Sequence, residues 1–306
     1  MSLETPSVVC LELVAEDGER LPDFAPGAHV DVSLPNRQVR SYSLVGRSPD
    51  DLGLRIGIKR EADSRGGSAW FHDVARLGMV LEITEPKGEF KLVEDAPETV
   101  FLAGGIGITP LLPMMRRLNA TERPWQLHYA AASPIEMPFM NLVHELAGER
   151  RRVQKYFSRG SASRMNICDL MRGLSDRTHA YCCGPAAMIN AFVEANVARD
   201  PRTVHFERFA TDKNAATSGG FVLELARDGR KLPVPEGKSV LDVLLDAGID
   251  VPYSCGQGVC GSCQTRVLAG QPDHRDCFLT EDERAANDSM LVCCSGARSS
   301  HLVLDL

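Results

Sequence analysis

Four cysteines in the last third of the chain have the residue type and spacing of a metal–sulfur site. Cys255, Cys260 and Cys263 follow the pattern C-x4-C-x2-C, and a further cysteine, Cys293, follows after twenty-nine intervening residues. Plant-type [2Fe–2S] clusters are held by four thiolates with this spacing. Glycines between the first three cysteines let the backbone approach the sulfides and adopt positive φ. The spacing therefore predicts a [2Fe–2S] cluster.

A zinc site or a set of unrelated buried thiols are the alternatives for these cysteines. Zinc sites generally use paired C-x2-C units, and this stretch has a single such unit, at 260–263. The spacing therefore favours iron and sulfide. A [2Fe–2S] cluster is a one-electron carrier, so another part of the chain has to supply its electrons.

A glycine-rich turn in the middle of the chain has the form of a nucleotide-phosphate site. The apolar stretch 99–103 runs into Gly104-Gly105-Ile106-Gly107-Ile108-Thr109-Pro110, and a helix is expected next. Glycines there permit close backbone approach, and a helix N-terminus offers free amides to a pyrophosphate. The pattern G-x-G-x-x-P departs from the full dinucleotide fingerprint, so a simple tight turn is the alternative. Its place at the head of an alternating strand–helix region favours nucleotide binding.

The choice between the two nicotinamide nucleotides depends on the residues after the second and third strands of this region. A 2′-phosphate requires a basic residue nearby, and the nearest in pattern are Arg159 and Arg164, after the third strand. No acidic residue closes the second strand, which ends in 130–134. We therefore expect NADH rather than NADPH.

The first third of the chain carries groups that suit a ring with a phosphate tail. Arg40-Ser41-Tyr42-Ser43 ends a predicted strand, Lys59 ends another, and Arg65-Gly66-Gly67-Ser68 opens a predicted helix. They supply an aromatic face, a guanidinium and free backbone amides, which a flavin nucleotide requires. Each also has a structural interpretation: Tyr42 as core, Arg40 as a solvated charge, and the glycines as loop.

Cys182-Cys183-Gly184-Pro185 lies at the predicted carboxyl end of a parallel strand, where ligands bind in such folds. A thiol there would face a nicotinamide, whereas burial as a small apolar residue suits Cys182. Nearby, His205 and Glu207 alternate with Phe206 and Phe209, which strand packing alone would produce.

Element patterns divide the chain into three domains and a linker. Short alternating strands over 1–98 predict an antiparallel β-barrel with a capping helix at 69–75. Strands and helices alternate over 99–209, which predicts a doubly wound α/β domain with a parallel sheet. Residues 210–219 have linker composition, and 220–306 predicts a hairpin, a helix at 239–247, the cysteine loop, a short helix near 281–286 and closing strands.

Bulk composition limits the classes of partner and compartment. The chain of 306 residues has a net charge of −7, which argues against nucleic acid binding because such proteins carry basic patches. Its longest apolar run, 100–115, is broken by glycines and prolines and is shorter than the roughly 20 residues of a membrane span. Ten cysteines without a signal-peptide pattern predict the reducing cytoplasm.

The order of these motifs resembles the phthalate dioxygenase reductase family, the class IA reductases of Rieske oxygenase systems, and the resemblance covers nearly the whole chain. It implies a β-barrel that binds FMN, an α/β domain that binds NADH, and a C-terminal plant-type ferredoxin domain with the β-grasp fold. The resemblance also selects Cys293 rather than Cys294 as the fourth ligand, because the family motif reads cysteine, one variable residue, then serine. The role of Cys294 is left open.

The same resemblance implies roles for individual residues. Phe209 would cover the flavin, and Cys183 would serve the nicotinamide, so these two are the predicted catalytic residues. The predicted FMN contacts are Arg40, Ser41, Tyr42, Ser43, Gly57, Lys59, Gly66, Gly67 and Ser68. The predicted NADH contacts are Gly104, Gly105, Gly107, Thr109, Pro110, Gly184 and Pro185. The predicted metal ligands are Cys255, Cys260, Cys263 and Cys293.

The resemblance implies that the chain passes electrons from NADH through FMN and the cluster to a Rieske-type terminal oxygenase, as in aromatic catabolism. Two alternatives are a reductase for another one-electron acceptor, such as a cytochrome P450, and a redox-sensing protein without turnover. The presence of all three cofactor motifs in one chain speaks against the sensor.

Overall fold

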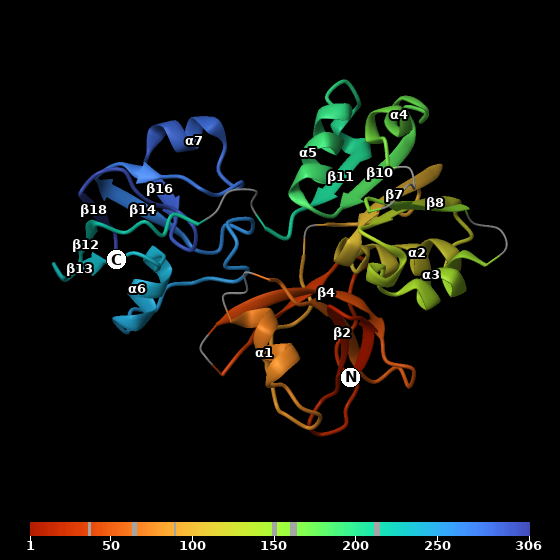
Figure 1. Ribbon diagram of the computed structural model, residues 1–306, viewed down its shortest axis with the longest axis horizontal. Helices are drawn as coiled ribbons and strands as arrows, with labels where there is room; N and C mark the ends of the chain where they lie inside the picture. The colour runs from red at the N-terminus through yellow and green to blue at the C-terminus, as the bar shows by residue number, and fades with distance from the viewer. Residues whose placement is uncertain (36–37, 63–65, 89, 149–151, 160–163, 211–214) are drawn as a thin grey trace. The chain divides into compact units, whose positions relative to one another are not determined.

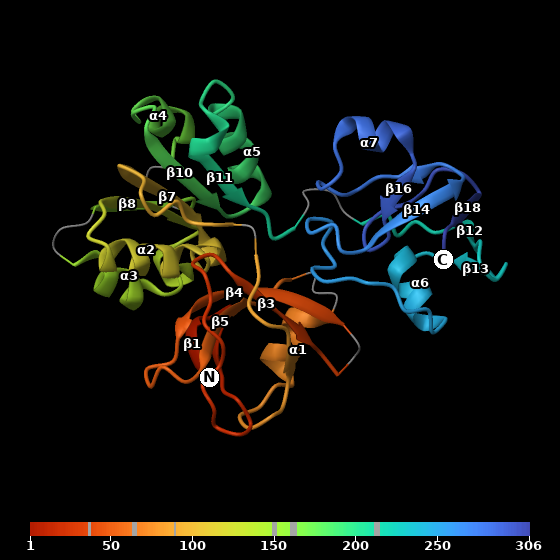
Figure 2. The same ribbon diagram turned by 180° about the vertical axis from the view of Figure 1, so that it is seen from behind.

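The computed structural model describes residues 1–35, 38–62, 66–88, 90–148, 152–159, 164–210 and 215–306. The chain divides into two compact units, Met1–Arg208 and Phe209–Leu306. The first unit holds an antiparallel and a parallel sheet, and the second holds a mixed sheet (Figure 1, Figure 2).

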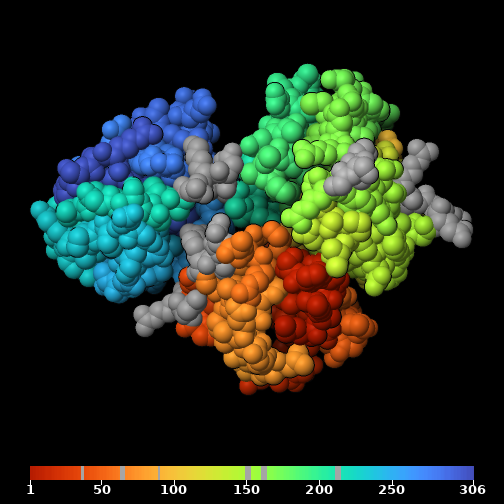
Figure 3. Space-filling model, viewed as in Figure 1, coloured from red at the N-terminus to blue at the C-terminus, as the bar shows by residue number. Residues whose placement is uncertain are grey.

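The antiparallel sheet of the first unit has the strand order β1-β2-β5-β4-β3-β6 and curls around one core. Alternating apolar residues of β2, β3, β4 and β5 fill that core, together with Phe71 of helix α1. Figure 3 shows the red start of the chain against orange residues, as the β2–β5 pairing requires. The elements are β1 (Ser2–Thr5), β2 (Val8–Leu13), β3 (His29–Ser33), β4 (Val39–Arg47), β5 (Leu54–Lys59), α1 (Gly67–Asp73) and β6 (Glu82–Ile83).

The parallel sheet has the order β11-β10-β7-β8-β9, and every described pair in it is parallel. Helices α4 and α5 pack on one face, and α2 and α3 lie on the other. The predicted doubly wound α/β fold is confirmed. The strands are β7 (Glu98–Gly104), β8 (Trp125–Ala131), β9 (Arg152–Phe157), β10 (Thr178–Cys183) and β11 (Val204–Glu207). The helices are α2 (Leu111–Ala120), α3 (Met140–Ala147), α4 (Ile167–Arg172) and α5 (Ala186–Ala195), with 3-10 turns η1 (Gly105–Ile108), η2 (Pro134–Glu136) and η3 (Pro201–Thr203).

The second unit has a mixed sheet in the order β13-β12-β18-β14-β16, in which β12 and β18 are parallel. Helix α6 buries Val240, Leu241 and Leu244 in the core of this unit. Its N-terminus is fixed by a capping box between Ser239 and Asp242, as the predicted N-cap requires. The elements are β12 (Phe221–Leu225), β13 (Lys231–Val234), α6 (Val240–Asp246), β14 (Gln264–Ala269), β15 (Pro272–Asp273), α7 (Glu281–Ala286), β16 (Ser289–Leu291), β17 (Gly296–Ala297) and β18 (His301–Leu304).

Some element boundaries differ from the sequence prediction. The strand expected at 80–85 is reduced to Glu82–Ile83, and the capping helix starts at Gly67 because Gly66 turns the chain with a φ of 96°. The strand β1 was not predicted. Of the predicted linker, residues 211–214 lie outside the described residues. Ala216 packs on the second unit, where its amide donates to the Cys294 carbonyl at 2.7 Å.

Among the described residues, no helix is long and apolar enough to cross a membrane.

The ends of β7 and β10 meet so closely that Gly107 leaves no room for a side chain. A Cβ there would lie 2.2 Å from the Cys183 carbonyl oxygen. We expect Gly107→Ala to lower the free energy of unfolding by about 1–3 kcal/mol or more. Hydrogen exchange of the β7 and β10 amides measures this effect within the first unit. Gly173→Ala is the matched control, since its nearest atom would be 3.6 Å away. Equal exchange in the two variants would contradict the close approach.

Candidate cofactor sites

The carboxyl ends of β7 and β10 form the crevice where the strand order of the parallel sheet reverses. From β7 the chain proceeds to β8 and β9 on one side, and β10 and β11 lie on the other. Ligands of open α/β sheets bind at such a switch point. A Cβ on Gly104 would lie 2.5 Å from Pro185 Cδ and 3.1 Å from the Gly184 Cα. The structure thus brings together two predicted nucleotide motifs that are distant in sequence.

Side-chain hydroxyl groups of the first unit hold the glycine turn in place through hydrogen bonds to its carbonyl oxygens. Thr109 is buried, and its hydroxyl donates to the Ile106 carbonyl at 2.9 Å, while Pro110 is the N-cap residue of α2. The hydroxyl of Tyr129 lies 3.0 Å from the carbonyl oxygens of both Gly105 and Pro138 and donates to them. Sequence analysis missed Tyr129, because an aromatic residue within an apolar strand has no signal that separates this role from packing.

Cys183 is fully buried at the end of β10. Burial is the main cause that raises the pKa of its thiol well above the ordinary value, and the nearby Glu207 carboxyl is the second cause. Cys183 therefore remains a neutral thiol at neutral pH, and reactive cysteines require the thiolate. The side chain can shape the crevice, but it does not supply a nucleophile.

Glu207 is the residue across from Cys183 on the neighbouring strand β11. Its Oε2 atom is buried and has no hydrogen-bond partner among the described residues. Burial raises the pKa of this carboxyl to about 8. A buried acid with such a pKa at the carboxyl edge of a parallel sheet is a functional-site candidate. Sequence analysis treated Glu207 as strand patterning, and no sequence signal placed it beside Cys183, because only the pairing of β10 with β11 brings the two together.

His205, on the same strand, serves packing. Its ring stacks on Tyr181 with centroids 4.3 Å apart, and its Nε2 shares a hydrogen bond of 3.0 Å with His179 Nδ1. Burial and then His179 lower the pKa of His205 to about 4, so the ring is neutral near pH 7. The patterning interpretation holds for His205.

Arg40 and Gly67 meet in the predicted flavin region. A Cβ on Gly67 would lie 2.8 Å from Arg40 Nε, so the missing side chain makes room for the guanidinium. Arg40 also donates to the Val39 carbonyl at 2.8 Å and to Gln38 Oε1 at 3.0 Å. Arg40 is a predicted contact of the flavin ring and Gly67 is a predicted contact of its phosphate. The structure therefore brings these two residues together.

The residues that follow Arg40 alternate between the two faces of β4. Tyr42 packs edge-on against Phe71 with ring centroids 5.4 Å apart, and burial raises the pKa of its hydroxyl. The Ser41 hydroxyl donates to Asp31 Oδ1 at 2.6 Å, and Ser43 is buried beyond it on the strand. Because successive strand residues face opposite sides, the predicted set is divided between the two faces.

The other predicted flavin contacts fall into two groups. Lys59 forms an ion pair with Glu61 at 3.0 Å, and Ser68 Oγ accepts from the Glu61 amide at 3.1 Å, so these lie close together beside α1. Gly57 instead lies against the first helices of the parallel sheet, where a Cβ would be 2.8 Å from the Phe139 ring. Its lack of a side chain therefore serves packing. Phe209 is partly buried and is the first residue of the second unit.

The four predicted cluster ligands stand in two pairs. Cys255 and Cys260 share a side-chain hydrogen bond, and so do Cys263 and Cys293. The bond shared by Cys255 and Cys260 lowers the pKa of Cys260 to about 4 and raises the pKa of Cys255, so the pair holds one negative charge between two sulfurs. In [2Fe–2S] sites each iron takes two protein ligands. Among the described residues, no three Cys, His, Asp or Glu side chains group as one metal ion requires.

Backbone amides surround the paired sulfurs. The Gln257 amide donates to Cys255 Sγ at 3.2 Å, and the Gly258 amide donates to Cys293. Gly258 has a φ of +74°, and a Cβ there would lie 2.7 Å from Cys294 Sγ. At Gly261, with a φ of +75°, a Cβ would meet the Phe278 ring at 2.3 Å. The loop therefore requires glycine for conformation and for space, as its sequence predicted.

Cys293 and Cys294 differ in their surroundings. Cys293 shares side-chain hydrogen bonds with Cys263 and with Cys294, whereas Cys294 Sγ also donates to the Leu291 carbonyl at 3.8 Å and packs on Gly258. The assignment of Cys293 as the fourth ligand stays a prediction. Cys277, which sequence analysis left without a role, contributes its amide to the Gly258 carbonyl at 3.0 Å.

Comparison with known proteins identifies both cofactor modules. Residues 223–298 match the family described as "2Fe-2S iron-sulfur cluster binding domain". Residues 101–194 match the "Oxidoreductase NAD-binding domain". The chain is thus an NAD-dependent oxidoreductase with a [2Fe–2S] domain.

Relatives of similar length define the family. "Phenoxybenzoate dioxygenase subunit beta" of Ectopseudomonas oleovorans is 46% identical over 98% of this chain and 93% of its own length. "Vanillate O-demethylase oxidoreductase" of Pseudomonas sp. (strain HR199 / DSM 7063) is 39% identical over 100% of this chain and 98% of its own. The solved structure of phthalate dioxygenase reductase is 35% identical, covers 99% of this chain and 95% of its own, and has a TM-score of 0.85.

The chain belongs to the phthalate dioxygenase reductase family. The predicted fold class and the predicted cofactors, FMN, NADH and a [2Fe–2S] cluster, are confirmed at the level of this family.

The pairing of Cys263 with Cys293 predicts different outcomes for two adjacent cysteines. Cys293→Ser should remove or destabilise the cluster and leave reduction of the flavin by NADH largely intact, because the flavin region lies in other residues. Cys294→Ser is the matched control and should retain the cluster. Visible absorption and electron paramagnetic resonance (EPR) of the purified proteins measure this. Loss of the cluster in the Cys294 variant alone would reverse the ligand assignment.

The buried carboxyl of Glu207 predicts a pH dependence of stability. Its folded-state pKa of about 8 exceeds the ordinary 4.5. Its stabilising contribution is therefore complete below about pH 4.5 and is lost as pH rises through about 8. As pH rises through this range, the free energy of unfolding of the wild type should fall by about 1–3 kcal/mol or more relative to that of Glu207→Gln. This is the cost of a buried unpaired polar group.

Thermal denaturation of both proteins from about pH 6 to about pH 9 measures this difference. Glu194→Gln replaces an exposed acid of the same unit and serves as the control. Parallel curves for the wild type and the Glu207 variant would show that the carboxyl does not change its charge in this range.

Proposed function

We propose that this chain is the NADH-dependent reductase component of a Rieske-type oxygenase system. The paired thiols of the cysteine loop carry the proposal, since they provide a one-electron exit in a chain with a nucleotide crevice. Relatives named as parts of oxygenase systems over nearly their whole length support the same conclusion. The terminal oxygenase would accept the electrons and act on the organic substrate.

When bound, FMN accepts a hydride from NADH, and the [2Fe–2S] cluster carries single electrons; these cofactors supply the redox chemistry. The chain's own residues bind and orient. Gly104 and Gly107 allow the glycine turn to pack against Cys183, Gly184 and Pro185 at the carboxyl ends of β7 and β10, where the nucleotide would bind. Cys183 and Glu207, both neutral at pH 7, present an uncharged wall at the predicted nicotinamide position. Positioning of this kind is the main contribution of a protein to hydride transfer.

The proposed FMN site is built around Arg40 and Gly67. The guanidinium is held by two hydrogen bonds and lies against Gly67 at the start of α1, and it would contact the ring and ribityl chain of the flavin. Lys59, Gly66 and Ser68 would complete the phosphate end. Tyr42 and Ser43 would contact the ring and the ribityl chain.

The proposed cluster ligands are Cys255 and Cys260 on one iron and Cys263 and Cys293 on the other. The amides of Gln257 and Gly258 would donate to the ligand sulfurs, which tunes the potential of the cluster. No ligand role is proposed for Cys294.

We also propose the domain limits 1–98 for FMN, 99–209 for NADH and 220–306 for the cluster, with 210–219 as the connection. The cytoplasm is the proposed compartment, because its reducing conditions suit ten cysteines.

The proposal predicts which acceptor takes electrons from NADH. We expect this reductase to reduce a purified Rieske-type oxygenase from the same organism at least about tenfold faster than a cytochrome P450, a difference of about 1.4 kcal/mol. Stopped-flow absorption under anaerobic conditions measures both rates. The Cys293→Ser variant is the control and should reduce neither acceptor. Faster reduction of the P450 would favour the alternative client, and bleaching by dithionite but not by NADH would favour a sensor.

A further inference from the structure

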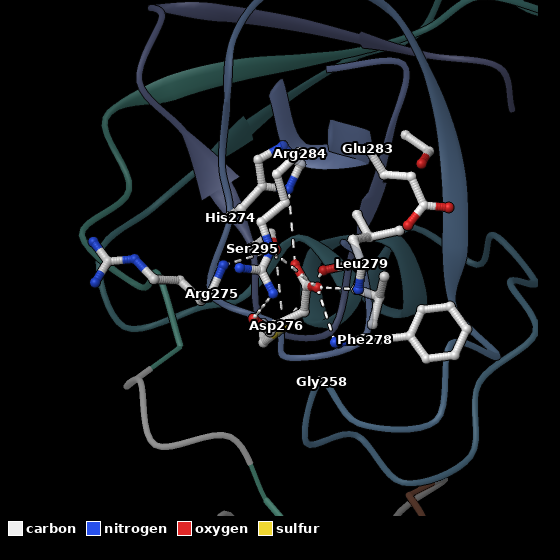
Figure 4. Close-up of polar contacts among 12 residues, drawn as sticks. Gly258, His274, Arg275, Asp276, Phe278, Leu279, Glu283, Arg284 and Ser295 are labelled. Carbon is white, nitrogen blue, oxygen red and sulfur yellow. Dashed lines mark hydrogen bonds and ion pairs between the residues drawn. The ribbon is translucent and has the colours of Figure 1, made fainter. Parts of the chain in front are cut away.

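A group of polar side chains with little exposure lies next to Gly258 of the cluster loop, in the second unit (Figure 4). It consists of His274, Asp276 and Arg284, whose side chains are 9%, 0% and 27% exposed. His274 and Asp276 follow strand β15, and Arg284 comes from helix α7. The group belongs to none of the motifs that predicted the cofactors.

The Asp276 carboxylate fixes the turn that follows it. Oδ2 accepts from the amides of Phe278 at 3.2 Å and Leu279 at 2.8 Å. Arg284 Nη2 donates to the Asp276 carbonyl at 3.1 Å, and its Nε lies 3.8 Å from Oδ2. The Asp276 side chain therefore closes a turn over 276–279. Arg284 of helix α7 contacts that turn and stabilises it.

The turn over 276–279 contacts Gly258, which lies in the middle of the cluster loop, residues 255–263. The Cys277 amide donates to the Gly258 carbonyl at 3.0 Å. The Asp276 Cα lies 3.2 Å from the place of a Cβ on Gly258, so the two backbones are in contact. The Gly258 amide donates to the Cys293 sulfur. A continuous path thus runs from the Asp276 carboxylate through two peptide groups to a proposed ligand.

The same carboxylate is incompletely compensated. Among the described residues, Oδ1 has no hydrogen-bond partner and faces His274 Nδ1 at 3.7 Å, and both His274 nitrogens are also buried without a partner. Burying a carboxylate costs free energy unless it is fully paired. Stability alone would favour an apolar residue here, so the role of Asp276 lies in the loop that it supports.

We propose that Asp276 is a positioning residue for the iron–sulfur cluster, acting through Cys277 and Gly258 on the hydrogen bond to Cys293. Hydrogen bonds to ligand sulfurs set the properties of such clusters, and partners of the ligands matter nearly as much as the ligands. The proposal rests on the proposed cluster site.

Three variants at position 276 test this role in the full-length holoprotein. Asp276→Asn keeps an oxygen that can accept from both amides, so its EPR spectrum after dithionite reduction and its rate of cluster loss should stay close to wild type. Asp276→Ala removes the acceptor, so the spectrum should change and cluster loss should become about 10–100-fold faster, the usual effect of losing an outer partner. Asp282→Ala, an exposed acid on α7, is the matched control and should match wild type.

Several outcomes would overturn the proposal. A role confined to folding would lower the melting temperature of Asp276→Ala but leave the EPR spectrum of the retained cluster unchanged. An Asn variant altered as much as the Ala variant would assign the effect to charge and not to the turn. If Asp276→Ala does not fold, Asp276→Val replaces it, because its side chain has no acceptor for either amide; a wild-type spectrum there would also contradict the role.

Failure of this inference differs from failure of the proposed function. If the wild type itself shows no cluster signal, or NADH fails to reduce its flavin, the reductase assignment is wrong. If the wild type has both and the Asp276 variants match it, only the positioning role is wrong.

Discussion

Close approach of backbone to backbone is the constraint on which both cofactor sites of this protein depend. At the parallel sheet, the ends of β7 and β10 lie so near each other that Gly104 and Gly107 cannot carry a side chain. In the cysteine loop, Gly258 and Gly261 combine positive φ with contacts that a Cβ would violate. Amides can point at a phosphate or a sulfur only where nothing else occupies that space.

The two sites meet this constraint with different supports. The nucleotide turn is held by two buried hydroxyls, that of Thr109, which donates to the Ile106 carbonyl, and that of Tyr129, which lies 3.0 Å from the Gly105 and Pro138 carbonyl oxygens. The cluster loop is held by a second turn, which Asp276 and Arg284 organise. In each case a polar group outside the motif sets the geometry of the motif, as outer partners commonly do.

Buried acids near both sites carry an energetic cost. Glu207 keeps an unpartnered oxygen beside Cys183, and Asp276 keeps one beside His274. Such groups are exceptions among native proteins, and they concentrate where function outweighs stability. Their neighbours differ: Glu207 lies on a strand edge whose burial favours its neutral form, whereas Asp276 accepts from two backbone amides and lies near a guanidinium.

The sequence by itself determined the cofactors and the class of fold. The C-x4-C-x2-C spacing, the glycine turn and the alternation of strands and helices are local patterns, and local patterns survive without a structure. The sequence also predicted the role of the glycines in the cysteine loop, because a backbone with positive φ favours glycine over other residues.

Only the tertiary structure decided how distant segments combine. It paired Cys263 with Cys293 and left Cys294 against Gly258. It placed Gly57 in a packing contact, divided Ser41 and Tyr42 between two strand faces, and gave Tyr129, Glu207 and Asp276 positions that no motif marks. Burial and pairing depend on what the rest of the chain brings near a residue, and a sequence read locally does not contain that information.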